Sequence, residues 1–468
     1  MMLFQADKLQ IILKYRVILS LFAAFFIPLK LIAAYFFLVP ALLLWGIDAL
    51  CSRQIGSRIL SLTALPLLIF AVSAALAAFF GIDPLRSLEK IGGFALLAAT
   101  IPLYLETATG VGAVRVLCCL LAGQAVAALH TVLEAAFPLW IPALFLGKVT
   151  ESGQLALSLV TAIGLIAYIS IRSAQGGNAN TPCVRSRPLL CFSYSPAGYF
   201  LGCLCFLLLC LAAFPLRLDT GGSVHFLIFL LAVCLLVLSL VPSLAALCRD
   251  PRNSHALLRL LLGVIVPLLS AALLVNLKRG PWAGVLAGLL ILIFLYGRRQ
   301  IFTVLAIIVA FSFSLPPVYQ RLANSADDFF ISGGRAEIWQ IGTELVTRYP
   351  LGVGYKNSSF LRSFSSEIPP QLTHFHNNIL NIAVETGWIS LAVLLWWLYL
   401  LLRGALSCPH VNPDAILRAS IGCALISWQV AGMVEYNFGD SEVWLMALLM
   451  VGVLSSLMTP AAKADLPT

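Results

Sequence analysis

The sequence predicts an all-α, polytopic membrane protein, and three observations lead to this fold class. Hydrophobic residues make up 61% of the 468 residues and charged residues 10%, whereas a soluble domain has about 25% charged residues. Apolar runs of about 20 residues, long enough to cross a bilayer as a helix, recur along the chain. The polar segments between them are short, so no part of the chain has the size and composition of an independent soluble domain.

The apolar runs predict roughly 12–14 transmembrane helices. The first run follows Lys8, Lys14 and Arg16 and has no small-residue cleavage site after it, which favours a retained span over a cleaved signal peptide. We expect transmembrane helices in 1–315, a large polar loop with short surface helices in 316–377, further transmembrane helices in 378–460 and a cytoplasmic tail in 461–468. The runs lie at 11–28, 31–50, 59–80, 91–105, 111–130, 152–172, 197–214, 223–247, 256–276, 281–297, 301–316, 378–402, 415–434 and 441–458.

The positive residues predict the orientation of the chain, because cytoplasmic loops carry the excess of Lys and Arg. Alternate loops are rich in arginine, whereas the loops between them are poorer and pair their cations with Asp or Glu, as at Arg86 beside Asp83. This bias places the 316–377 loop outside, in the periplasm of a Gram-negative cell. It also explains the net charge of +9 without a nucleic-acid partner. The arginine-rich loops contain Arg53, Arg58, Arg172, Arg185, Arg187, Arg249, Arg252, Arg259, Arg298, Arg299, Arg403 and Arg418.

The cysteines indicate neither a metal site nor a disulfide framework. The 12 cysteines are scattered, mainly in apolar runs, and none lies in residues 316–381. No pair has the spacing of a zinc site, and buried, inert thiols are the simplest interpretation. We expect no metal and no cofactor.

The longest polar interval, Pro316–Asn381, contains the motifs GGRAEIW, PLGVG and THFHNN. A long loop in a compact protein usually serves chemistry or recognition. Its middle predicts a surface helix over Arg335–Tyr349 with Trp339 at the membrane interface, stopped by Pro350. The glycines of PLGVG either bring backbone close to a partner or turn a corner.

His376 is the strongest candidate for catalysis. It lies with His374 in HFH, directly before an apolar helix that Asn377 or Asn378 can cap. The helix dipole favours the neutral imidazole, which can accept a proton. Two other interpretations stay open at this point: a capping or interfacial histidine, and a His-x-His metal pair, although no Cys or carboxylate cluster accompanies it.

Arginines on the same side of the membrane are candidates for binding a diphosphate, because guanidinium groups are planar, permanently charged donors. Arg279 lies in a tight break between two predicted spans, and Arg335 begins the predicted surface helix. Snorkelling to the interface is the alternative for Arg279. Arg217 is a further outer arginine, which Asp219 can neutralise. Glu435, in the last outer loop, either orients a substrate, pairs with an arginine or lies in solvent.

Together these motifs resemble the O-antigen ligase and O-antigen polymerase superfamily. The resemblance covers about residues 270–400 and rests on Arg279-Gly280, Gly334-Arg335-Ala336-Glu337-Ile338-Trp339, Pro350–Gly354, and His376-Asn377 followed by Glu385-Thr386-Gly387. It implies a multi-pass, GT-C-like, inverting and metal-independent glycosyltransferase of the bacterial inner membrane, with its active site facing the periplasm.

The resemblance also implies substrates and roles. The donor would be an undecaprenyl-diphosphate-linked glycan and, in the ligase branch, the acceptor would be an outer-core sugar of lipid A–core, with membrane lipids around the protein. Arg279 and Arg335 would bind the diphosphate and His376 would be the catalytic residue in the loop 316–377. His374, Asn377, Arg217 and Glu435 are possible supporting residues.

Two alternatives remain from the sequence. The nearer one is a polymerase of O-antigen or exopolysaccharide, or a protein O-oligosaccharyltransferase, since these use the same donor. The other is a lipid or polysaccharide transporter, for which charged residues in mid-span, paired broken helices or internal repeats would be the sign.

Overall fold

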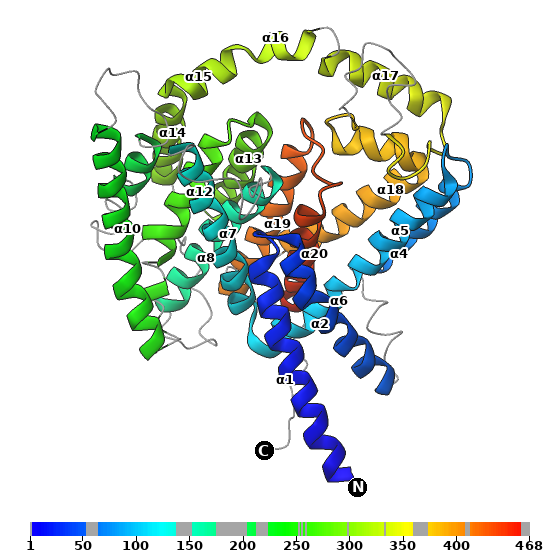
Figure 1. The fold of residues 1–468 in the computed structure, drawn as a ribbon, viewed down its shortest axis with the longest axis horizontal. Coiled ribbons are helices and arrows are strands. Elements are labelled where there is room, and N and C mark those ends of the chain that lie inside the picture. The colour runs from blue at the N-terminus through cyan, green and yellow to red at the C-terminus, as the bar shows by residue number, and fades with distance from the viewer. Residues whose placement is uncertain are drawn as a thin grey trace.

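The computed structural model describes residues 2–52, 64–136, 152–174, 204–211, 223–250, 253, 256–257, 260–296, 299–331, 334–358, 373–407 and 412–459. The regular elements in these residues are all helices (Figure 1), which confirms the all-α class. They are α1 (Met2–Phe26), α2 (Leu31–Cys51), α4 (Leu65–Ala78), α5 (Pro84–Ala98), α6 (Thr100–Val111), α7 (Ala113–Ala136), α8 (Ser152–Ala174), α10 (Ser223–Arg249), the π-helical turn η1 (Leu261–Ile265), α12 (Val266–Val275), α13 (Arg279–Tyr296), α14 (Arg299–Ser314), α15 (Pro316–Ala323), α16 (Ser325–Phe330), α17 (Arg335–Arg348), α18 (Asn378–Leu406), α19 (Pro413–Ala431) and α20 (Ser441–Met458).

Eight helical stretches in the described part of the chain are long and apolar enough to cross a membrane, or nine if the bent pair of α14 and α15 counts as one span. This confirms a polytopic membrane protein. The predicted 12–14 spans stay a prediction, because several runs fall partly outside the described residues. The run predicted at 91–105 lies within one candidate span, Pro84–Val111, which consists of α5 and α6 meeting at Ala99. The tail 461–468 and most of the linker 173–196 lie outside the described residues.

A row of glycines packs α13 closely against α19. A Cβ added to Gly280, Gly284 or Gly288 would lie 2.8, 2.3 or 2.8 Å from a backbone carbonyl oxygen of α19. Small residues four apart form one face of a helix and let two backbones approach, which is a common way to pack membrane helices. The row fixes the start of α13, and with it Arg279, beside the end of α19.

Helix α18 is broken at Gly387, and the PLGVG loop fills the break. In a continuous helix the Trp388 N–H would bond to the Val384 carbonyl. Here Trp388 N–H donates to the Pro350 oxygen at 3.1 Å, and the Val384 oxygen accepts from Val353 N–H at 2.8 Å. The loop thus satisfies the backbone groups that the break leaves free, as is required at membrane depth. Of the two interpretations of PLGVG, close backbone approach is therefore the one observed.

Further contacts tie this loop to its surroundings. Ile82 N–H, in the turn between α4 and α5, donates to the Val353 oxygen at 2.8 Å. Asn357 Nδ2 donates to Ser87 Oγ of α5 at 3.1 Å, and the Ser358 hydroxyl donates to the buried carboxylate of Glu385 on α18. The loop therefore links α5 and α18 as one unit.

Helices α15, α16 and α17 cross one end of the bundle (Figure 1). Helix α14 turns into α15 through a bend of 84°, where Pro316 and Pro317 begin the new helix. Helix α17 covers Arg335–Arg348 and ends before Pro350, which confirms the predicted surface helix. Residues 359–372 of the loop lie outside the described part.

Three charged side chains, two of them buried and Glu106 partly exposed, join the N-terminal helices. Arg16 Nη1 lies 3.1 Å from Asp48 Oδ2 and 3.0 Å from Glu106 Oε2. The Trp45 indole N–H donates to Glu106 Oε1 at 2.9 Å. Charged groups within membrane helices are costly unless they pair with one another. This cluster meets that requirement and ties α1, α2 and α6 together.

We predict that Gly387→Ala destabilises the protein by at least about 2 kcal/mol. The φ of Gly387 is +75° with ψ 177°, and an added Cβ would lie 2.5 Å from the Pro350 oxygen. Thermal unfolding of the purified protein in detergent measures the effect. Gly92→Ala is the matched control, because nothing lies within 4 Å of its Cβ position. Equal melting temperatures for the two variants would contradict the role given to the break.

Candidate active site

Two of the three residues predicted to carry the chemistry meet at one carboxylate. Arg335 Nη2, at the start of α17, donates to Glu435 Oε1 at 3.1 Å. His376 Nδ1, just before α18, lies 3.8 Å from Glu435 Oε2. All three side chains are only partly exposed, between 18 and 26%. Of the three roles considered for Glu435, pairing with an arginine is the one observed.

Arg279 lies at the start of a helix that packs close to Glu435. It is the first residue of α13, and a Cβ on its neighbour Gly280 would lie 3.1 Å from Glu435 Cγ. The turn before it places Leu277 at a φ of 51°, and this turn accepts a hydrogen bond from Arg321 of α15 at the Leu277 oxygen, 3.2 Å. The Arg279 side chain lines a cavity between helices. A tight break thus sets the position of this arginine at the start of α13, and its part in the site stays a prediction.

Asn377 holds the segment of His376 to the loop that carries Glu435. Its Oδ1 accepts from Leu380 N–H at 3.0 Å, which makes it the cap of α18 and confirms one of the two predicted caps. Its Nδ2 donates to the Met433 oxygen at 3.0 Å. The cap therefore also fixes the distance between His376 and the loop between α19 and α20.

Asn378 adds a second set of bonds between the same two segments. Its backbone N–H donates to the Gly432 oxygen at 2.7 Å. Its buried Oδ1 accepts from the backbone N–H groups of Asn437 and Phe438, both at 3.0 Å. These bonds anchor the loop on both sides of Glu435. They therefore restrict the movement of its carboxylate.

His374 packs against His376. The two rings are 4.3 Å apart and nearly perpendicular, and His374 Nδ1 accepts from the backbone N–H of His376 at 3.3 Å. Burial, together with the nearby His376, lowers the pKa of His374 to about 4, so this ring is neutral at pH 7. Among the described residues no three His, Cys, Asp or Glu side chains are grouped to hold a metal ion.

Glu435 carries a negative charge at neutral pH. Burial raises the pKa of its carboxyl, but the His376 imidazole and the charges of Arg335 and Lys278 outweigh burial, so the pKa lies below its usual value. A carboxylate beside an imidazole can orient the ring and stabilise its protonated form. In the sequence Glu435 is only a possible supporting residue, because nothing local distinguishes it from a solvated loop residue. Arg217 lies outside the described residues.

We predict that the stability of the protein falls between about pH 6.5 and 5 through His374. A folded-state pKa of about 4 against an unfolded value of about 6.5 means that the unfolded chain binds more protons in this range, so unfolding is favoured as the pH falls. His374→Gln removes this contribution. Melting temperatures of both proteins measured from pH 7.5 to 5 should show the smaller decline in the variant; parallel curves would contradict the burial of a neutral ring.

Comparisons with known proteins agree on the region that holds these residues. Residues 264–395 match a family model described as O-Antigen ligase. Two relatives, each described as a "putative polysaccharide ligase", come from Rickettsia typhi (26% identical over 133 residues) and Rickettsia felis (29% over 129 residues). The aligned segments cover 26% and 25% of this chain.

The match with these relatives is partial, since the chain spans about a third of their length, 32% and 31%. The matched family segment nevertheless contains Arg279, Arg335 and His376 together with the PLGVG loop and the break in α18. Over this segment the chain is similar to the O-antigen ligase family, and the match and these relatives together support the O-antigen ligase superfamily.

Proposed function

We propose that this protein is a polysaccharide ligase: a glycosyltransferase that moves a glycan from a polyprenyl diphosphate to an acceptor hydroxyl. One observation carries the proposal. Arg335, Glu435 and His376 converge at the end of the bundle where Arg279 borders an apolar cavity. In a lipid diphosphate donor, the tail would enter the apolar cavity, the phosphates would bind the arginines, and the sugar would lie near the proton-accepting histidine.

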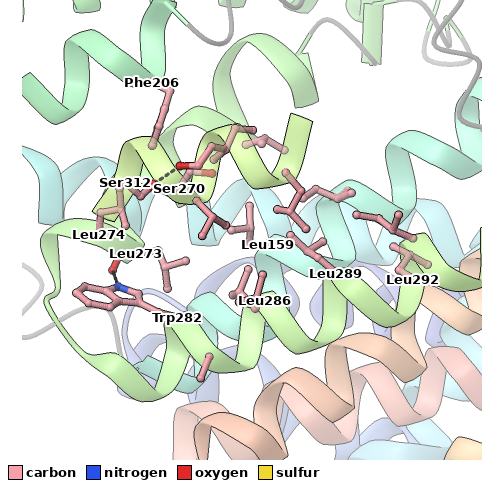
Figure 2. A pocket seen from close by; sticks show the side chains of 18 of the residues that line it. Leu159, Phe206, Ser270, Leu273, Leu274, Trp282, Leu286, Leu289, Leu292 and Ser312 are labelled. Atoms are coloured by element: carbon pink, nitrogen blue, oxygen red, sulfur yellow. Dashed lines mark hydrogen bonds between the residues drawn. The ribbon is translucent and has the colours of Figure 1, made fainter. Parts of the chain in front are cut away.

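The cavity supports a lipid-borne donor. It has a volume of about 560 Å³ and lies between α8, α12, α13 and α14. Figure 2 shows its apolar side chains, among them Leu159, Leu286, Leu289 and Leu292. Arg279 is the only charged residue among the described residues that line it. An isoprenoid tail fits such a lining, and its diphosphate would then lie at the arginine.

The chemistry follows from these positions. Displacement of a diphosphate from an anomeric carbon builds negative charge on the leaving group, which Arg279 and Arg335 stabilise in a partly dry site. His376 accepts the proton of the attacking hydroxyl, a contribution of about 10²–10⁴-fold. Glu435 orients the imidazole and stabilises the imidazolium. A single displacement inverts the anomeric centre, and no metal ion takes part in the steps assigned to these residues.

The finer assignment within the superfamily is O-antigen ligase. The donor would be undecaprenyl-diphosphate-linked O-antigen and the acceptor an outer-core sugar of lipid A–core, at the periplasmic face of the inner membrane. The arginine distribution along the loops supports this side of the membrane, and the family match supports the ligase branch. A periplasmic enzyme has no nucleotide sugars at hand, which suits a lipid-borne donor.

The deciding assay uses purified protein in lipid nanodiscs with polyprenyl-diphosphate glycan and lipid A–core, without ATP and with a chelator present. Transfer under these conditions supports the proposal. Elongation of the donor glycan in place of transfer would identify a polymerase. Absence of any turnover with movement of the donor across a sealed membrane would identify a transporter.

In this assay we predict that Arg279→Ala, Arg335→Ala and His376→Ala each reduce transfer by at least about 10²-fold. Glu435→Gln keeps the shape of the side chain and removes its charge, and should lower kcat by at least about tenfold. Membrane insertion, checked by quantifying the purified protein, should be unchanged. Activity like that of the wild type in any variant removes that residue from the mechanism.

We also predict that Leu286→Trp, which fills the cavity, raises the KM for a long-chain donor by about tenfold and leaves a short-chain donor analogue unaffected. The physical reason is that only a long isoprenoid reaches into the cavity. Leu290→Trp is the matched control, since Leu290 is on the same helix, 40% exposed and not part of the lining. Equal effects on both donors would contradict a tail site here.

A further inference from the structure

His376 has an unusual backbone. Its φ is +50°, in the left-handed region that residues with a side chain rarely adopt. Such a conformation persists only where the surroundings hold it in place, and it is found disproportionately at functional sites. The groups that hold the peptide before His376 therefore decide where the imidazole points.

Both ends of that peptide group are held by side chains. The Phe375 carbonyl accepts the indole N–H of Trp339 at 2.9 Å, and the His376 N–H donates to His374 Nδ1 at 3.3 Å. The preceding N–H, that of Phe375, donates to Asn381 Oδ1 at 3.1 Å. The Phe375 side chain itself is fully buried. Rotation of this peptide plane, which would change the φ of His376, breaks the Trp339 bond.

Trp339 reaches this carbonyl from the helix that carries Arg335. The two residues are four apart on α17 and so share one face of the helix. The Trp339 ring also packs edge-on against Phe329 of α16, with centroids 5.3 Å apart. The position of this indole at the membrane interface stays a prediction, and in the structure its N–H bonds to the Phe375 carbonyl.

We propose that Trp339 is a positioning residue for His376, which couples the placement of the proton acceptor to that of the diphosphate-binding Arg335. The inference rests on the proposed function for its kinetic consequence but not for its geometry. A misplacement of a catalytic group by a small distance is enough to slow a reaction strongly. Loss of the indole N–H should therefore act on the chemical step rather than on donor binding.

Trp339→Phe tests this, because it removes the N–H and keeps an aromatic ring against Phe329. We expect kcat to fall by about tenfold or more with little change in the KM for the donor. In a His376→Ala background the same substitution should leave the residual rate unchanged, since its effect passes through His376. Trp396→Phe, at a 44% exposed tryptophan of α18, is the control and should retain full activity.

A second measurement is independent of turnover. The rate at which diethylpyrocarbonate modifies His376, followed by peptide mass spectrometry, should rise several-fold in Trp339→Phe and stay unchanged in Trp396→Phe. If the wild type transfers no glycan, the proposed function fails and this rate still decides the role of Trp339. Unchanged kcat and modification rate, or an equal loss of activity with and without His376, would overturn the inference.

Discussion

The carboxylate of Glu435 is the group on which the arrangement of the site depends. An isolated charge in this partly buried loop would be costly, and it is tolerated because Arg335 bonds to one oxygen and His376 lies near the other. The three residues come from α17, from the start of α18 and from the loop between α19 and α20. Long-range folding is therefore required before the arginine, the histidine and the carboxylate can meet, and each of them then restricts the other two.

The backbone around this carboxylate is irregular, which is unusual at the end of a membrane bundle. Here each irregular segment has its own partners: the PLGVG loop bonds to the broken turn of α18, and Asn377 and Asn378 bond to the loop 432–438. Unsatisfied backbone groups would be costly at this depth. The bonds that satisfy these backbone groups also hold the site residues in position. The same contacts therefore stabilise the fold and orient the site.

The sequence predicted the class of the fold, most helix positions late in the chain and the residues around which the site forms, because these follow from local signals. Helix α20 coincides with the predicted run 441–458, and Asn377 caps the helix that follows it. The break at Gly387 and the pairing with Glu435 could not be predicted in this way. In a hydropathy pattern the segment around Gly387 is a continuous apolar run, so the break is not visible. Glu435 meets its partners only through long-range contacts, with Arg335 100 residues and His376 59 residues away in the chain. The bond from the Trp339 indole to the Phe375 carbonyl, 36 residues away, is likewise not a local signal and could not be predicted.

Under the proposed reaction, binding of the donor changes which groups neighbour the Glu435 carboxylate. Before the donor enters, the Glu435 carboxylate is balanced mainly by Arg335. A diphosphate brings oxygens that compete for the same guanidinium, and a bidentate phosphate contact is among the strongest that arginine makes. As Arg335 turns toward the phosphate, Glu435 is left with the His376 imidazole near its other oxygen. There it can keep the ring oriented toward the acceptor hydroxyl that has to lose its proton. The Glu435 carboxylate can thus bind Arg335 in the empty site and, once the donor has entered, orient His376 for the transfer.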